Sequence, residues 1–258
     1  MLTPEEEQLA YQLGQLGQTL GWVDNIGITG NQRDLYYLID FFTYLVDQAY
    51  PQIPCPTGCS HCCVDSGLPR TSSLEWRLIY AYLLRMPEPV WQRIKAQNDT
   101  FHGHQLGLFL QEQERIARPD SNVPLPDFDC KACPFLLDGK CSIYEVRPAI
   151  CRGFGYFTWR RNGLAEESQL FACRMAADTL FASLKARNSE QAVLPVWNRI
   201  SDHLYALEQE LGTNTFATLP MWLSAHTAPE DSGERLLDLD LTPDFPALLQ
   251  IEQTGQTE

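Results

Sequence analysis

The spacing of apolar side chains along the chain predicts a mostly helical protein. In residues 4–20 and 32–49, apolar side chains recur three or four positions apart, which places them on one face of a helix. These positions are Leu9, Leu13, Leu16 and Leu20 in the first stretch, and Leu35, Leu38, Phe42 and Leu45 in the second. Similar patterns predict helices over 73–86, 89–94, 109–117, 165–188 and 195–211.

Capping and helix-breaking residues mark where these helices begin and end. Ser72 and Glu75 form a capping-box pattern, which predicts that a helix begins directly after Ser72. Pro51 and Pro54 interrupt regular structure just before a run of cysteines. Residues 118–135 contain four prolines and three aspartates, so we expect an extended loop there.

These patterns together predict a mainly α fold. We expect a single helical domain in which two irregular, cysteine-rich loops converge on a metal or cluster site. Residues 1–54 are predicted to form N-terminal helices that pack on the core, and residues 55–175 a cysteine-cluster metal-binding region. Residues 176–258 are predicted to form C-terminal helices and an acidic tail within the same compact unit.

Composition and charge narrow the possible environments and partners. Apolar residues make up 44% of the chain, enough for a core that needs no disulfide staples. The formal net charge of -14 disfavours binding to nucleic acids and to anionic membranes. The acidic start MLTPEEEQ does not resemble a signal peptide, and no apolar run is long enough to span a bilayer. We therefore expect a soluble, cytoplasmic protein whose thiols stay reduced.

The cysteines are concentrated in the middle of the chain. All nine lie between positions 55 and 173, and they include the knuckle spacings Cys59-x-x-Cys62 and Cys130-x-x-Cys133. In a reducing compartment such clusters indicate metal or redox chemistry. The candidate metal ligands are Cys55, Cys59, Cys62, Cys63, Cys133, Cys141, Cys151 and Cys173.

The adjacent pair Cys62–Cys63 limits how the ligands can be arranged. Neighbouring side chains point about 100° apart in a helix and in opposite directions in a strand, so both thiolates are not expected on one tetrahedral zinc ion. The pair can serve two mononuclear sites, or bind different irons of one cluster, or include one spare thiol. The sequence leaves these three arrangements open.

The donor type restricts the metal. A set of thiolates favours zinc or iron–sulfur over magnesium, calcium or manganese. Four thiolates around a dication leave a net charge of about -2, which benefits from cationic neighbours. Arg147 and Arg152 lie close to Cys151 in the sequence and are candidate cofactor-binding residues.

Two sequence blocks resemble a known family. The run CPTGCSHCC, followed by CPFLLDGKCSIYEVRPAICRGF, is similar to the cysteine-cluster family called YkgJ or CxxCxxCC, described as a zinc- or iron-chelating domain. The matching residues are Cys55, Cys59, Cys62 and Cys63 in the first block, Cys133, Cys141, Arg147, Pro148, Cys151 and Arg152 in the second, and Cys173 as a late cysteine of some members. Cys130 lies outside the pattern and is interpreted as a bystander.

The residues and the resemblance support three functional hypotheses. The first is an iron–sulfur protein with a redox or cluster-carrier role, favoured because many matched cysteines and a vicinal pair suit a polynuclear cluster. The second is a zinc-stabilised scaffold that presents helices to another protein. The third is a lysine N-methyltransferase-like enzyme, which the resemblance implies because flagellin lysine N-methylases are similar in the same blocks. Whether the protein is an enzyme is left open.

Histidines are assigned a minor role. His61 lies between the cysteines and is interpreted as a solvent-facing loop residue. His102 and His104 form an H-x-H pair without a third ligand of fitting spacing, so we interpret both as surface residues.

Overall fold

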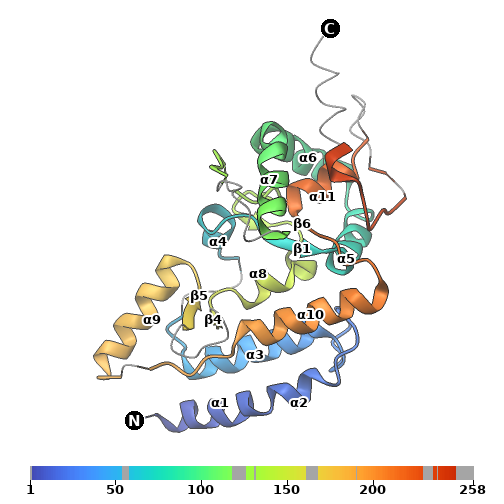
Figure 1. Cartoon of the computed structure of the whole chain (residues 1–258). Coiled ribbons are helices and arrows are strands. Elements are labelled where there is room, and N and C mark those ends of the chain that lie inside the picture. Colours follow the sequence, from blue (N-terminus) through green and yellow to red (C-terminus); the bar gives the residue numbers. More distant parts are fainter. Residues whose placement is uncertain are drawn as a thin grey trace. The chain divides into compact units, whose positions relative to one another are not determined.

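The structure of this protein is a computed structural model. It describes residues 2–53, 58–117, 126–130, 132–160, 168–189, 191–228, 235–236 and 238–247, and the described residues are mainly helical, as predicted (Figure 1). The chain divides into two compact units. Unit 1 consists of Met1–Cys62 and Arg147–Gly212, and unit 2 of Cys63–Val146 and Thr213–Glu258. The division of the sequence into residues 1–54, 55–175 and 176–258 stays a prediction.

Unit 1 is built around neighbouring helices from the two ends of its sequence. Its helices are α1 (Pro4–Gly14), α2 (Leu16–Leu20), α3 (Leu35–Ala49), α8 (Ala149–Gly153), α9 (Arg174–Ala186) and α10 (Trp197–Leu211). Its strands β4 (Phe157–Arg160) and β5 (Ser168–Phe171) pair antiparallel. Helix α3 packs against α1, α2 and α8, and α10 packs against α2 and β4 (Figure 1).

Both capping and apolar burial explain the helices of unit 1. Thr3 and Glu6 form a capping box at the start of α1, with reciprocal backbone-to-side-chain bonds of 3.2 and 2.8 Å. One core cluster of this unit contains apolar side chains from α1, α3 and α9, together with Cys173. Its buried members are Leu9, Val46, Tyr50, Ile53, Cys173, Ala176, Leu180 and Leu184. Burying each large aliphatic or aromatic side chain contributes about 1.5–3 kcal/mol.

Unit 2 combines helices with short antiparallel strand pairs. Its helical elements are α5 (Ser73–Leu83), α6 (Glu88–His102), η1 (Gly103–Gln105), α7 (Leu106–Ala117), η2 (Tyr144–Val146) and α11 (Leu219–Ala225). Its strands are β1 (Arg70–Ser72), β2 (Leu136–Leu137), β3 (Lys140–Cys141) and β6 (Phe216–Thr218). Strand β1 pairs with β6, and β2 pairs with β3. Helix α11 packs against α6 and α7.

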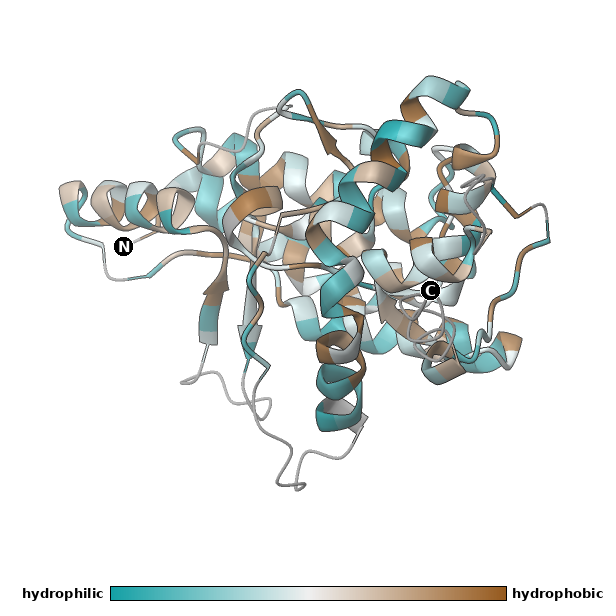
Figure 2. Ribbon diagram, turned by 90° about the horizontal axis from the view of Figure 1, so that it is seen from above, coloured by the Kyte–Doolittle hydropathy of each residue, from teal (hydrophilic) through white to brown (hydrophobic). Residues whose placement is uncertain are grey.

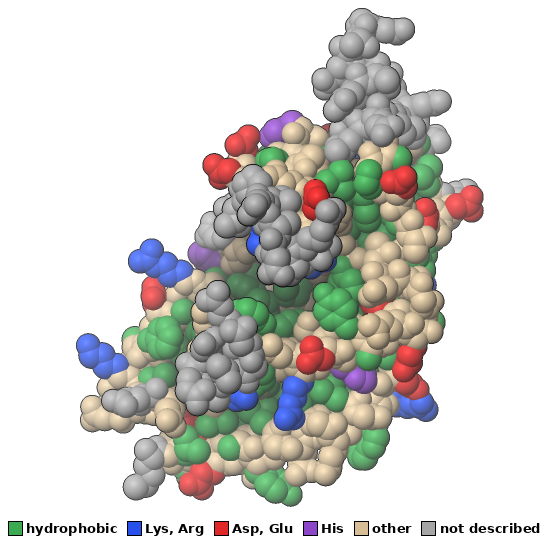
Figure 3. Space-filling view, in the orientation of Figure 1, with side chains coloured by type: hydrophobic (Ala, Val, Ile, Leu, Met, Phe, Trp, Pro, Cys, Tyr) green, Lys and Arg blue, Asp and Glu red, His purple; other side chains and the backbone are tan. Residues whose placement is uncertain are grey.

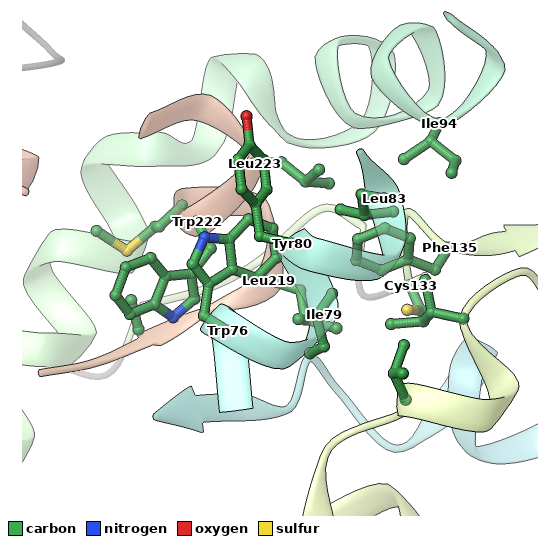
Figure 4. Packing of buried hydrophobic residues seen from close by; sticks show 14 of the residues in the cluster. Trp76, Ile79, Tyr80, Leu83, Ile94, Cys133, Phe135, Leu219, Trp222 and Leu223 are labelled. Carbon is green, nitrogen blue, oxygen red and sulfur yellow. The ribbon is translucent and has the colours of Figure 1, made fainter. Parts of the chain in front are cut away.

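The core of unit 2 is rich in aromatic side chains. Trp76 on α5 stacks on Trp222 on α11, with ring centroids 5.6 Å apart (Figure 4). The indole nitrogen of Trp222 donates to the carbonyl of Thr71, at 3.0 Å, which satisfies a polar atom inside the core. The predicted capping box is confirmed, because Ser72 caps α5 and bonds reciprocally with Glu75.

One predicted helix begins later than the sequence indicates. The pattern predicts a helix over 165–188, but Ser168–Phe171 forms strand β5 and α9 begins at Arg174. Tertiary pairing overrides the helical pattern here, since β5 pairs with β4 and Phe171 stacks on Trp197 with centroids 5.5 Å apart. Residues 165–167 lie outside the described part of the chain.

Hydropathy and charge are mixed along the helices and over the surface. Apolar and polar residues follow one another around individual helices (Figure 2). No helix in the described ranges is both long and apolar enough to cross a membrane. On the face shown in Figure 3, acidic and basic side chains are interspersed with hydrophobic and other side chains.

Candidate metal centre

The first cysteine block contains the point in the sequence at which the chain passes from unit 1 to unit 2. Cys55 lies outside the described residues. Cys59 is half-buried and precedes the short helix α4 (His61–Asp65), which carries Cys62 and Cys63. The division between the units falls between these two cysteines, so Cys62 is assigned to unit 1 and Cys63 to unit 2. Since successive helical side chains diverge by about 100°, the two thiols leave α4 in different directions. His61 is exposed, as predicted.

Within unit 2, the backbone of the first cysteine block meets that of the second. The amide nitrogen of Cys133 donates to the carbonyl oxygen of Cys63, at 2.7 Å. The amide of Leu136 then donates to the Cys133 carbonyl, at 3.1 Å, and closes a turn directly after the knuckle. Two segments far apart in the sequence are therefore joined at Cys63 and Cys133.

A tight hairpin delivers Cys141 to the same region. Strands β2 and β3 pair so that Cys141 lies opposite Leu136. The turn between them has positive φ at both central residues, 50° at Asp138 and 74° at Gly139, as the Asp-Gly pair predicts. The amide and hydroxyl of Ser142 both donate to the carbonyl of Phe135, at 2.8 and 2.9 Å, which fixes the end of the hairpin.

The hydrophobic core of unit 2 borders these cysteines. Cys133 is buried, and its sulfur lies near Phe135 and Ile79 (Figure 4). Cys63 and Cys141 are half-buried and pack against the same cluster. A metal held there would therefore be partly shielded from water, which strengthens electrostatic interactions with its ligands.

Three polar side chains that the sequence analysis missed hold the second cysteine block. Gln97, His102 and Gln105 come from α6 and η1 and bond to backbone groups between positions 129 and 136. The interpretation of His102 as a surface residue is wrong, because its side chain is fully buried. Burial lowers the pKa of His102, since the charged imidazolium would lose its hydration. His104 is exposed, as predicted, and lies 3.5 Å from Asp129.

The remaining described cysteines belong to unit 1. Pro148 occupies the N-cap position of α8, and the amide of Cys151 donates to the Pro148 carbonyl at 2.9 Å. Cys151 is half-buried. Cys173 occupies the N-cap position of α9 and is buried among apolar side chains, including Val46 and Tyr50.

The candidate cofactor-binding arginines also lie in unit 1. Arg152 is buried, and one of its terminal nitrogens lies 2.6 Å from a carboxylate oxygen of Asp40 on α3. Its guanidinium stacks over the ring of Tyr36, 4.2 Å from the centroid. Its Nε donates to the carbonyl of Arg147, at 3.2 Å. Arg152 therefore fixes α8 against α3, and a role for either arginine beside a cofactor stays a prediction.

The described side chains do not form a ready-made metal site. Among them, no three His, Cys, Asp or Glu residues are grouped as metal ligands would be. The structure thus shows the backbone contact between Cys63 and Cys133, but not the predicted convergence of the loops on one site. The eight predicted ligands and the two arginines stay predictions.

Comparison with known proteins supports a metal-binding role. No curated protein and no solved structure matches the chain. Residues 54–170 match the model of the CxxCxxCC family, whose description reads "Putative zinc- or iron-chelating domain". The match spans both cysteine blocks and both arginines, and it ends before Cys173. Over residues 54–170, which make up less than half of the chain, this protein is similar to the CxxCxxCC family.

Proposed function

We propose that the protein binds an iron–sulfur cluster through cysteine thiolates and that this cluster has a redox or carrier role. The hydrogen bond between Cys133 and Cys63 carries the proposal, because it brings together two cysteine blocks that belong to one metal-chelating domain.

The donor set fits this cofactor. The candidate ligands are all cysteines, and thiolates favour zinc and iron–sulfur centres over metals that prefer oxygen ligands. The vicinal pair favours a polynuclear centre, because two thiolates that leave α4 in different directions can reach different irons. When bound, a cluster would supply one-electron chemistry.

The surroundings of the cysteines suit a protected cluster. The apolar cluster beside Cys133 would limit access of water to a bound centre, and solvent exposure is one determinant of cluster potential. Arg147 and Arg152 flank Cys151 in the sequence, so their positive charges are candidates to offset the negative charge of a thiolate-ligated cluster.

The proposal is tested by loading and spectroscopy of the whole chain. Protein purified without oxygen should contain iron and inorganic sulfide and absorb broadly in the visible range. Cys141→Ser should lose most of the iron. Cys130→Ser is the matched control, since Cys130 is in a C-x-x-C spacing with Cys133 but lies outside the family pattern. Stoichiometric zinc without iron would overturn the iron–sulfur proposal.

A zinc-stabilised scaffold for a protein partner is the second candidate. The burial of Cys133 in the core of unit 2 favours it, because an ion bound there would be coupled to folding of that core. In this case the protein is colourless, and removal of zinc lowers the melting temperature. An unchanged melting temperature after complete removal of zinc would contradict the scaffold role.

A further inference from the structure

The second cysteine block is held by polar side chains of one helical segment. The amide nitrogen Nε2 of Gln97 lies 3.2 Å from the carbonyl oxygens of Cys133 and Pro134, and 3.0 Å from that of Leu136. His102 Nε2 lies 2.7 Å from the carbonyl of Ala132. These contacts cover the backbone on both sides of Cys133.

Gln105 extends the same arrangement to the other end of the knuckle. Its amide nitrogen donates to the carbonyl of Cys130, at 3.4 Å, and its carbonyl oxygen accepts from the amide of Asp129, at 2.8 Å. Gln105 is almost completely buried, as is His102. Backbone groups of Asp129, Cys130 and the segment Ala132–Leu136 are thus bonded repeatedly to side chains of α6 and η1.

The contact at Gln97 depends on its amide group. Three carbonyl oxygens point toward one nitrogen that carries two hydrogens, so the bonds must be shared. Without this donor the three carbonyl oxygens would lose a shared hydrogen-bond partner, and the segment would be held less firmly. His102 has a similar role, because only a protonated Nε2 can donate to the Ala132 carbonyl, which fixes the tautomer of the ring.

These hydrogen bonds fix the position of the backbone from which the cysteine side chains extend. The direction of a Cα–Cβ bond follows from the backbone conformation, so a fixed backbone fixes the origin and direction of each thiol. A ligand set held in advance loses less conformational freedom when a metal binds. Groups that orient metal ligands typically change metal affinity by about 10–100-fold when they are removed.

We propose that Gln97 and His102 are positioning residues of the metal centre, which hold the backbone around Cys133 in its ligating conformation before the metal arrives. The inference rests on the proposed function, since it assumes that Cys133 is a ligand. It adds a role for α6, whose residues are neither metal ligands nor part of the cysteine pattern.

The test compares variants of the reduced, full-length chain. Gln97→Met removes the donor and keeps the length of the side chain, and His102→Phe removes the donor and keeps a flat ring. The matched control is Gln113→Met, because Gln113 on α7 is also half-buried and donates to a backbone carbonyl of the same unit, that of Phe216 at 2.8 Å. Zinc affinity is measured by competition with a chromophoric chelator, and melting temperature is measured in parallel.

We expect Gln97→Met and His102→Phe to weaken zinc binding by about 10–100-fold. Gln113→Met should leave the affinity within about threefold, even where its melting temperature falls, since it does not hold a cysteine segment. His102→Gln retains an N–H donor and should recover part of the lost affinity. A purely structural role would lower the melting temperature of all these variants without separating their affinities.

The outcomes distinguish this inference from the proposed function. If the wild-type chain binds neither zinc nor iron, the proposed function fails and the inference fails with it. If the wild type binds metal and Gln97→Met binds it equally well, the inference alone is overturned. Should Gln97→Met not fold, the comparison of His102→Phe with His102→Gln decides, and equal affinity of these two variants would overturn the inference.

Discussion

The two compact units hold their cysteines in different ways. In unit 2, Cys133 lies on an irregular segment whose backbone is bonded to polar side chains of α6 and η1. In unit 1, Cys151 and Cys173 lie on or beside helices α8 and α9, so helical geometry fixes their backbones. Irregular structure needs side-chain donors to become rigid, whereas a helix satisfies its own backbone groups. The thiols of unit 2 should therefore depend more strongly on remote polar residues.

The two units also differ in buried titratable groups whose pKa is shifted. Unit 2 buries the neutral imidazoles of His102 and His226, and burial lowers the pKa of both. Unit 1 buries Glu6, which has an arginine beside it. The following changes act on one unit at a time and so test whether the units respond separately.

The largest effect is expected from truncation of the core of unit 2. Trp222→Ala removes a fully buried indole that stacks on Trp76, and should lower the free energy of unfolding by about 3–5 kcal/mol. Denaturant titration measures the change. Trp22→Ala is the control in unit 1, because 68% of Trp22 is exposed, and it should change stability by less than about 0.5 kcal/mol. Equal losses in the two variants would contradict the packing described for unit 2.

In unit 1, the next largest loss of stability is expected from a change at the contact between α3 and α8. Asp40→Asn removes the charge that faces the buried guanidinium of Arg152. Since Asp40 itself is half-exposed, solvent screening reduces the loss to about 1–2 kcal/mol. Chemical denaturation checks this value. Asp178→Asn, in the exposed pair with Arg174, is the control and should have almost no effect.

A smaller effect is expected from the capping box of α5. Ser72→Ala removes the hydroxyl that accepts from the Glu75 amide and should destabilise unit 2 by about 1 kcal/mol. Thr3→Ala breaks the equivalent box of α1 in a less buried setting, so we expect a smaller loss in unit 1. Thermal melting of both variants compares them, and a larger loss for Thr3→Ala would show that burial does not determine the contribution of the cap.

The smallest effect is expected from moderate acid, and it should appear first in unit 2. A lowered histidine pKa means that the unfolded chain binds protons more readily than the folded one below pH 6.5. The contribution of the neutral His102 and His226 is thus complete above pH 6.5 and is lost as the pH falls below it.

Unit 1 should respond only at a lower pH. Burial alone would raise the pKa of Glu6, but the Thr3 amide, the Tyr50 hydroxyl and Arg187 together lower it below 4.5. Its contribution is complete above pH 4.5 and is lost below that value. Hydrogen exchange of the metal-free chain at pH 7.5 and 5.5 should show faster opening in unit 2 alone, and His226→Gln should reduce the difference. Equal acceleration in both units would contradict this assignment.

Local signals in the sequence predicted several elements correctly. The capping box predicted at Ser72 is present, because it depends on residues that are neighbours in the sequence. The turn at Asp138-Gly139 and the helix after Pro148 depend on neighbouring residues in the same way. The apolar periodicity of 32–49 likewise corresponds to α3, whose buried face includes Leu35, Leu38 and Phe42.

Features that depend on remote partners were not predicted. Strand β5 forms where the pattern predicted a helix, because β4 lies beside it. Gln97 and His102 bond to carbonyl groups of a segment that is distant in the sequence. The residues next to them in the chain therefore do not indicate these roles. One signal was present: Asn98, His102 and Gln105 continue the buried stripe of Trp91 and Ile94 with helical spacing, and a polar residue on such a stripe needs a partner.

In the candidate site too, some features depend on neighbours in the sequence and others on residues far apart in the sequence. The cysteine spacings are local patterns, and they lie within residues 54–170, which match the family model. The grouping of these cysteines into sites depends on how the chain folds back, and the bond between Cys133 and Cys63 is one point of contact between the two blocks. The convergence of their sulfurs on one centre stays a prediction.

X-ray absorption spectroscopy at the iron and zinc edges, on the whole chain purified without oxygen, tests whether cysteine thiolates hold an iron–sulfur cluster. An iron–sulfur cluster held by thiolates predicts an iron edge with a first shell of sulfur and a second shell of neighbouring iron. A first shell of oxygen or nitrogen, or the absence of bound iron, would contradict the account.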